Sequence, residues 1–214
     1  PVSLDKTFLL QGPPSTGKSE IARRAAKCLA LPYVQLDGKA LKTRERLFQM
    51  IDDVLSASDL MPAREGTRGG VPIMRYPPFV VNVDEIHLAS EGVQQGFLTA
   101  LERDDRTVLL DTAHYRRIAN VRGSAFIFST TRPADIDRAL RSRCTEIELT
   151  RYSAGEVARM AQKRFSWMTD DHARRIALAS RLTPRVAFDL ATDMREELWV
   201  SEDPSATHAL DRVL

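Results

Sequence analysis

One segment near the start of the chain has the residue types and spacing of a phosphate-binding loop. The segment GPPSTGKS fits the pattern G-x-x-x-x-G-K-[ST] and follows the apolar run TFLLQ directly. Backbone N–H groups in such a loop, and the N-terminus of the helix after it, attract an anion. The Lys18 ammonium group can then reach the β and γ phosphates of a nucleotide, and the Ser19 hydroxyl can ligate Mg²⁺. The alternative is a glycine-containing turn that only leads into a helix. We predict a nucleotide site formed by Gly12, Pro13, Pro14, Ser15, Thr16, Gly17, Lys18 and Ser19.

Two adjacent carboxylates are the second candidate for chemistry. Asp84 and Glu85 follow the apolar run FVVNV at once, which places both at the C-terminal end of a buried strand. Open α/β sheets bind their ligands at that edge. Asp84, with Ser19, can hold Mg²⁺, while Glu85 can orient or deprotonate a water that attacks the γ-phosphate. The alternative for the acidic pair is a cap or turn, and His87 in the same DEIH segment is interpreted as a surface or internally satisfied polar residue.

An alternation of short apolar runs and longer helical patterns must position these residues. Apolar runs bounded by turn residues predict strands, and the amphipathic stretches between them predict helices. This order is typical of βα units on a buried parallel sheet, so we predict an α/β fold with a doubly wound parallel sheet. The strands are expected at residues 7–11, 32–36, 78–83, 124–129 and 145–149, and the helices at 18–30 and 43–56.

The pattern changes near residue 150. From residue 153 onwards, apolar residues recur at helical spacing without strand-like runs between them, which predicts a small all-helical domain. The domains expected are therefore a nucleotide-binding core over 1–150, a helical lid over 151–200 and the start of a linker helix over 201–214.

Composition limits the classes of protein to which the chain can belong. Of its 214 residues, 31 are Lys or Arg and 29 are Asp or Glu, so the formal charge of +2 does not by itself indicate nucleic-acid binding. Cys28 and Cys144 lie far apart, which argues against a zinc cluster and against a disulfide framework. No apolar run approaches the roughly 18 residues of a membrane span, and no signal-type N-terminus is present. We expect a cytoplasmic protein without membrane contact.

Five motifs in a fixed order resemble those of AAA+ ATPases. They are GPPxxGKS, VDEIH, FSTTR, ALRSRC and LTPRVA, and together they extend over most of the chain. The resemblance is greatest to the RuvB type of Holliday-junction branch-migration motor, with clamp-loader ATPases next. It implies a P-loop core with a helical lid, ATP and Mg²⁺ as cofactors, and assembly into a homo-oligomeric ring, expected to be hexameric.

The resemblance also gives roles to two residues near the nucleotide. Thr131, in STTR, resembles the polar sensor that lies beside Glu85 at the tip of a strand, and Thr130 is its rival. Arg185 follows a Thr-Pro pair typical of a helix start, so it lies in a first helical turn, where a cation needs an anionic partner. In the family this position is a second sensor that contacts the γ-phosphate from the lid.

An arginine finger is expected near the end of the core. Arg143, in RSRC, resembles the arginine that reaches the nucleotide of a neighbouring subunit and stabilises charge on the transferred phosphoryl group. Arg138 and Arg141 are competitors for this role. The alternative is an ordinary basic helix end.

The chain departs from the family pattern in three ways. Ser15 stands where RuvB-type loops have Gly, so a positive φ there would strain the loop. Residues 58–78 have turn and loop composition, are longer than the family pattern, and are interpreted either as a pore-facing loop or as a disordered insertion. The segment that cradles adenine and the C-terminal winged-helix domain are not expected within this sequence.

Residues 102–124 predict two short strands around a turn near 112–115, immediately before the STTR strand. The resemblance places here a β-hairpin that contacts DNA or a partner protein. Arg116, Arg117 and Arg122, with Tyr115, could supply phosphate contacts and base stacking. A solvated basic surface is the alternative.

The function expected from the sequence is that of an ATP-hydrolysing ring motor that acts on DNA. Clamp loading is an alternative, supported by the RSRC motif, which departs from the usual RuvB form at Cys144. A nucleotide-gated assembly or targeting factor that acts on a protein partner, in transposition, phage replication or defence, is a further alternative.

Overall fold

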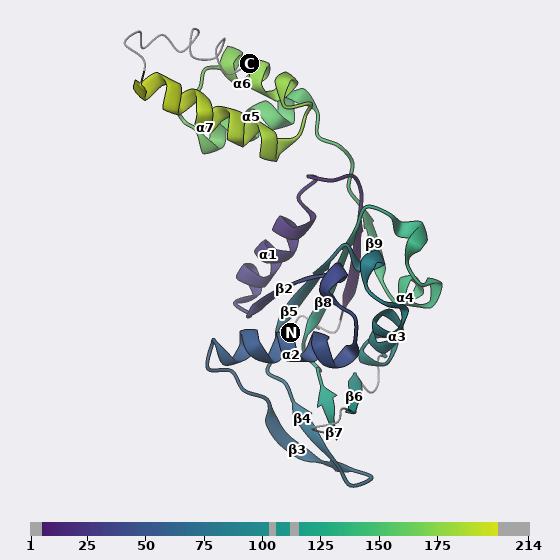
Figure 1. Ribbon diagram of the computed structural model, residues 1–214. Coiled ribbons are helices and arrows are strands. Elements are labelled where there is room, and N and C mark those ends of the chain that lie inside the picture. Colours follow the sequence, from purple (N-terminus) through teal and green to yellow (C-terminus); the bar gives the residue numbers. More distant parts are fainter. Residues whose placement is uncertain (1–5, 103–105, 112–115, 201–214) are drawn as a thin grey trace. The chain divides into compact units, whose positions relative to one another are not determined.

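The computed structural model describes residues 6–102, 106–111 and 116–200 (Figure 1). The contacts divide them into two compact units. The first unit contains the described residues up to Gly12 and from Gly17 to Leu149, and it is an α/β structure. The second contains Pro13–Thr16 and the described residues from Thr150 onwards, and its regular structure is helical.

A five-stranded parallel sheet forms the centre of the first unit. Its strands lie in the order β2 (Tyr33–Asp37), β5 (Val80–Asp84), β8 (Ala125–Thr130), β1 (Thr7–Gln11) and β9 (Thr145–Glu148). The strand β8 is buried along its whole length, as expected for a central parallel strand that is covered on both faces. Each of these strands lies where an apolar run predicts one, and the prediction of an α/β fold is confirmed.

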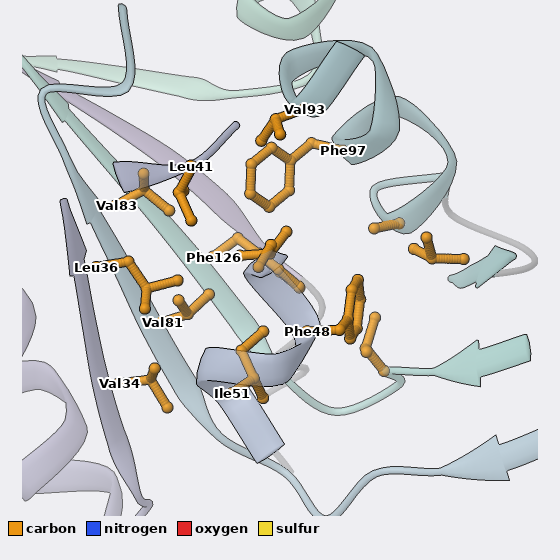
Figure 2. Close-up of a cluster of buried hydrophobic side chains, with 14 of the residues drawn as sticks. Val34, Leu36, Leu41, Phe48, Ile51, Val81, Val83, Val93, Phe97 and Phe126 are labelled. Atoms are coloured by element: carbon orange, nitrogen blue, oxygen red, sulfur yellow. The ribbon is translucent and has the colours of Figure 1, made fainter. Parts of the chain in front are cut away.

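Helices cover both faces of this sheet, with α1 (Lys18–Leu29) on one face and α2 (Arg44–Ser56) and α3 (Glu91–Ala100) on the other. Ala22 and Ala26 of α1 pack on a small apolar cluster of the first face. Figure 2 shows Phe48 and Phe97 in the larger cluster of the second face, where the ring of Phe97 lies 5.9 Å from that of Phe126. Burial of aromatic side chains of this size is a main source of stability, which fixes the sheet as a rigid support.

The carboxyl ends of the parallel strands meet at one edge of the sheet. β1 ends at Gln11, β5 at Asp84 and β8 at Thr130. The register places Gln11 opposite Thr130, and Asp37 at the end of β2 opposite Asp84. Segments that are far apart in the sequence therefore leave the sheet side by side, which is the arrangement that a ligand site at this edge requires.

A second sheet corrects the interpretation of residues 58–78 as a loop or a disordered insertion. It has four strands in the order β3 (Ala63–Arg68), β4 (Val71–Arg75), β7 (Arg116–Asn120) and β6 (Thr107–Asp111) (Figure 1). β3 and β4 form an antiparallel hairpin whose turn is Gly69-Gly70, both with positive φ, which suits a two-residue hairpin turn. β4 then pairs in parallel with β7, so strands distant in sequence stabilise the insertion.

The two strands predicted within residues 102–124 are confirmed. β6 and β7 are antiparallel, with Val108 opposite Ala119, and both of these side chains are buried in the core of the first unit. The turn expected between them, including Tyr115, lies outside the described residues.

Three helices form the second unit, α5 (Ala154–Arg164), α6 (Asp170–Ala179) and α7 (Pro184–Val200). A capping box starts α5, in which the Ser153 side chain accepts from the N–H of Glu156 and the Glu156 carboxylate accepts from the N–H of Ser153. Apolar residues from all three helices share one core. The expected linker helix over 201–214 lies outside the described residues. In the described part of the chain, no helix combines the length and apolar character needed to cross a membrane.

Candidate nucleotide-binding site

The GPPSTGKS loop contains backbone positions that side chains disfavour. Gly12 and Gly17 have φ of 150° and 87°, and a Cβ added at Gly12 would lie 2.2 Å from the carbonyl oxygen of Leu149. Ser15 has φ of 62°, so this position does need a positive φ, at a cost of about 1–2 kcal/mol for a residue with a Cβ. Gly17 is the N-cap of α1 and no side chain caps it, so the first N–H groups of the helix are left to bind an anion.

Lys18 is a buried cation at the first position of α1. The residue is 7% exposed, and its Nζ donates to the carbonyl oxygen of Gly12 at 2.9 Å. Burial lowers the pKa of the Lys18 ammonium group, and the charges of Glu85 and Asp84 oppose this by raising it. A phosphate beside Lys18 would stabilise the charged form further, since an opposite charge offsets the cost of burial.

Ser19 and Asp84 come together as the sequence predicts for a magnesium site. The Ser19 hydroxyl donates to Oδ2 of Asp84 at 2.7 Å. A hydroxyl and a carboxylate oxygen are ligands that Mg²⁺ prefers, and Mg²⁺ usually keeps several waters and binds phosphate oxygens as well. Among the described residues, no group of three or more His, Cys, Asp and Glu could hold a metal ion.

The carboxylate of Glu85 is bound by the residue that follows β8. Its Oε2 accepts from the backbone N–H of Thr131 at 3.1 Å and from the Thr131 hydroxyl at 2.9 Å. Thr130, the rival sensor, is fully buried, and its hydroxyl oxygen lies 2.9 Å from Nδ1 of His87 instead. The structure therefore brings Thr131, and not Thr130, onto Glu85.

A glycine that the sequence analysis did not single out fixes the backbone of Glu85. Glu85 has a left-handed backbone, with φ of 49° and ψ of 52°, and it precedes the short 3₁₀ helix η2 (Ile86–Leu88). Gly38, at the start of η1 (Gly38–Ala40), is buried against it. A Cβ added at Gly38 would lie 2.3 Å from the carbonyl oxygen of Glu85. Only a glycine lets the two segments approach this closely.

Gly38→Ala is expected to lower the free energy of unfolding by about 1–3 kcal/mol, because an extra methyl group in a packed site forces the backbone to shift. The shift must move Glu85, so ATP turnover should fall as well. Denaturant unfolding and ATPase assays measure the two effects. Gly92→Ala is the control, since a Cβ at Gly92 in α3 would meet open space. Equal behaviour of the two variants would contradict the positioning of Glu85 by Gly38.

His87, which the sequence analysis set aside from the chemistry, lies within this cluster. Its side chain is 4% exposed, and its Nδ1 lies 3.1 Å from Oε2 of Glu85. Its Nε2 accepts from Nε of Arg132 at 3.0 Å. No periodic pattern in the sequence indicates that His87 lies near Glu85. The two side chains meet because the left-handed backbone of Glu85 turns His87 back towards it.

The candidates for the arginine finger lie on and after α4 (Arg138–Ser142). Arg141 pairs with Glu146 at 2.8 Å. Arg143 is exposed, and its Nη1 donates to the carbonyl oxygen of Ala139 at 3.2 Å. Arg138 is also exposed. Arg143 and Arg138 therefore remain better placed than Arg141 to reach another molecule.

Five predicted site residues belong to the second unit: Pro13, Pro14, Ser15, Thr16 and Arg185. Within that unit, the Tyr152 hydroxyl donates to the carbonyl oxygen of Thr16 at 3.0 Å. Arg185 is exposed in the first turn of α7, which begins at Pro184 as its Thr-Pro pair predicts. Its contact with a nucleotide stays a prediction.

The basic residues of the β6–β7 hairpin differ in what they contact. Arg117 forms an ion pair with Asp52 of α2, and its guanidinium also donates to the Tyr76 hydroxyl at 2.9 Å. Its side chain is 20% exposed, so in this structure it serves the protein interior and does not project as a free phosphate contact. Arg116 is exposed, 3.2 Å from Asp111, and Arg122 is exposed.

Comparison with known proteins identifies the family to which this site belongs. The profile described as "ATPase family associated with various cellular activities (AAA)" matches residues 8–152, which is more than half of the chain. The chain belongs to the AAA family of ATPases. Its P-loop fold and its resemblance to RuvB agree with this assignment.

Two proteins named Holliday junction branch migration complex subunit RuvB illustrate the similarity of this AAA chain to its relatives. The protein of a Wolbachia strain from Drosophila simulans is 27% identical over 214 residues, which cover 96% of this chain and 60% of the relative. That of Trichormus variabilis is 29% identical over 196 residues, covering 88% of this chain and 48% of the relative. The chain thus spans about half to three fifths of these curated relatives.

Solved structures agree with the AAA fold. The Thermotoga maritima RuvB Holliday junction branch migration motor superposes with a TM-score of 0.69 at 24% sequence identity, covering 98% of this chain and 60% of that chain. The P216G mutant of the same protein gives a TM-score of 0.71 at 22% identity. At this level of identity, the similarity establishes the fold.

Proposed function

We propose that this chain is the ATP-hydrolysing part of a ring-shaped motor that acts on DNA in the manner of RuvB. The observation that carries the proposal is the convergence at one sheet edge of Lys18, a Ser19–Asp84 pair and a Glu85 carboxylate bound by Thr131. The names of the relatives, all of which refer to branch migration of Holliday junctions, support the choice of DNA as the substrate.

The chemistry proposed is attack of a water on the γ-phosphorus of ATP. Glu85 accepts a proton from that water as its oxygen bonds to phosphorus, and the bond to the bridging oxygen breaks to release ADP and inorganic phosphate. Mg²⁺, held by Ser19 and Asp84, would neutralise charge on the phosphates. Lys18 binds the same phosphates, and Thr131 holds Glu85 in place. Arg185 is proposed to contact the γ-phosphate from the helical lid.

A ring is proposed because Arg143 resembles the arginine finger that AAA+ ATPases supply to the nucleotide of a neighbouring subunit. Arg143 is exposed at the end of α4, so it can supply its charge to the nucleotide of a neighbouring copy. Such an arrangement makes hydrolysis depend on assembly, expected to be hexameric. The exposed Arg116 in β7 and Arg122, two residues after the end of β7, are the side chains proposed to contact DNA phosphates, or a protein partner, in the assembled ring.

The test is the ATPase rate across protein concentration, with and without branched DNA. We expect the rate per chain to rise steeply with concentration and to increase with branched DNA. Arg143→Ala should lower the rate by about a thousandfold, the effect typical of an arginine finger, while ATP binding by the separate chain is retained. Arg138→Ala tests the competing finger candidate in the same assay, and Arg174→Ala, which changes an exposed arginine of α6, is the control.

The outcomes separate the proposed function from its alternatives. A rate that is independent of both concentration and Arg143 would contradict the ring. Stimulation by primed-template DNA in place of branched DNA would favour clamp loading, the function suggested by the clamp-loader-like sequence around Cys144. Indifference to all DNA would favour a nucleotide-gated factor that acts on protein.

A further inference from the structure

Four side chains form a chain of contacts that ends on Glu85. Asp135, in η3 (Pro133–Asp135), lies 3.4 Å from Nη1 of Arg132, and Nε of Arg132 donates to Nε2 of His87 at 3.0 Å. On the other side of the ring, Nδ1 of His87 lies 3.1 Å from Oε2 of Glu85. The ring itself is buried, whereas Arg132 and Asp135 are more than half and about half exposed.

These contacts determine which nitrogen of His87 carries the proton. Arginine is always protonated and has no acceptor, so Nε2 of His87 must accept and cannot carry a proton. The neutral ring therefore has its proton on Nδ1, because the bond made by one nitrogen sets the state of the other. Nδ1–H then donates to the hydroxyl oxygen of Thr130 at 2.9 Å, and this oxygen also accepts from the N–H of Arg132 at 3.0 Å. Oε2 of Glu85 lies 3.1 Å from the same ring nitrogen.

The proton on Nδ1 places a partly positive hydrogen close to one oxygen of Glu85, beside the two hydrogen bonds from Thr131. Oε2 already accepts from the N–H and the hydroxyl of Thr131, and His87 approaches the same atom. Each donor fixes the direction of the carboxylate, and none of the described contacts on Glu85 involves Oε1. Oε1 is thus the oxygen available to take a proton from water.

We propose that His87, oriented by Arg132, is a positioning residue that holds Oε2 of Glu85 and so directs Oε1 towards the attacking water. This inference rests on the proposed function, since it concerns the general base of that reaction. It differs from a packing role, because a buried polar ring that only fills space would need neither the Nδ1–H form nor an arginine on its far side.

The first test observes the ring directly and does not depend on ATPase activity. Long-range ¹H–¹⁵N correlation spectra of the whole chain, assigned with His87→Asn among its 4 histidines, distinguish the two neutral forms. We expect the Nδ1–H form for His87, and a shift towards the Nε2–H form in Arg132→Gln. Arg138→Gln, which changes an exposed arginine without a described contact to His87, should leave the form unchanged. An Nε2–H form in the parental chain would overturn the proposal.

The second test is kinetic and uses three substitutions of His87. His87→Ala should lower kcat by about 10–100-fold, the range typical for residues that orient a reacting group, with ATP affinity and KM changed by less than about twofold. His87→Asn keeps a donor near the place of Nδ1 and should restore most of kcat. His87→Gln places its amide near Nε2, loses that donor, and should resemble His87→Ala.

Equal losses in the Asn and Gln variants, or a parental kcat in His87→Ala, would overturn the positioning role. Failure of the proposed function would give a result that differs from failure of this positioning role. The parental chain would then show the Nδ1–H form of His87 but no ATP turnover at any concentration.

Discussion

Glu85→Gln is expected to lower ATP turnover by about 10²–10⁴-fold while ATP still binds. The amide has nearly the same shape as the carboxylate but cannot accept a proton, and general-base catalysis contributes a factor of this size. Its oxygen can still accept from Thr131, so the loop after β8 should keep its place. Single-turnover hydrolysis and equilibrium binding of labelled ATP measure the two quantities separately.

Glu196→Gln controls for the loss of one negative charge, because Glu196 is exposed on α7 in the second unit. The charge of Glu85 raises the pKa of Lys18, so removing it should lower that pKa further and weaken ATP binding first at high pH. Binding is therefore compared near pH 7. Turnover by Glu85→Gln at the parental rate would show that another group accepts the proton.

Lys18→Ala is expected to weaken ATP binding by about a hundredfold, which corresponds to about 2.7 kcal/mol. Lys18 is 7% exposed, and desolvation lowers the pKa of its ammonium group, so its attraction to phosphate is screened less than that of a fully exposed lysine. Turnover at subsaturating ATP should fall with the affinity. Isothermal titration with a slowly hydrolysed ATP analogue measures the change.

Lys27→Ala is the matched control, because Lys27 is an exposed lysine in the last turn of the same helix. The unfolding midpoint should be compared as well, since Lys18 also donates to Gly12 and could support the loop. An unchanged affinity in a stably folded Lys18→Ala protein would refute the assignment of GPPSTGKS as the phosphate loop.

The inner strands of the central sheet could be predicted from the sequence because they are runs of apolar residues followed by a polar end, whereas the edge strand β9 is exposed along its length. FVVNV followed by Asp84, for example, marks both the buried strand β5 and the edge where it stops. The carboxyl ends of parallel strands share one edge by geometry, so the sequence predicts that Asp84 and Glu85 lie near Lys18.

The insertion and the contacts of single side chains could not be predicted in the same way. The segment AREGTR, which forms β3, has few apolar residues. It pairs with β4, and β4 in turn pairs with β7, which lies more than forty residues later in the chain. The sequence around Arg117 does not indicate that its guanidinium group contacts Asp52 and Tyr76 in the fold. Partners of this kind depend on tertiary packing, which local patterns do not contain.

The parallel pairing of β4 with β7 has a mechanical consequence. Tyr76 continues that pairing, since its N–H donates to the carbonyl oxygen of Asn120 at 2.9 Å, and its hydroxyl donates to Asp52 of α2. The β3–β4 and β6–β7 hairpins are thus joined through β4 and β7, and Tyr76 links them to Asp52 of α2. A force along β4 or β7 would load the hydrogen bonds between these strands in shear, and residues 76–84 connect β4 to Asp84 at the end of β5. A displacement of one hairpin is therefore expected to displace the other as well.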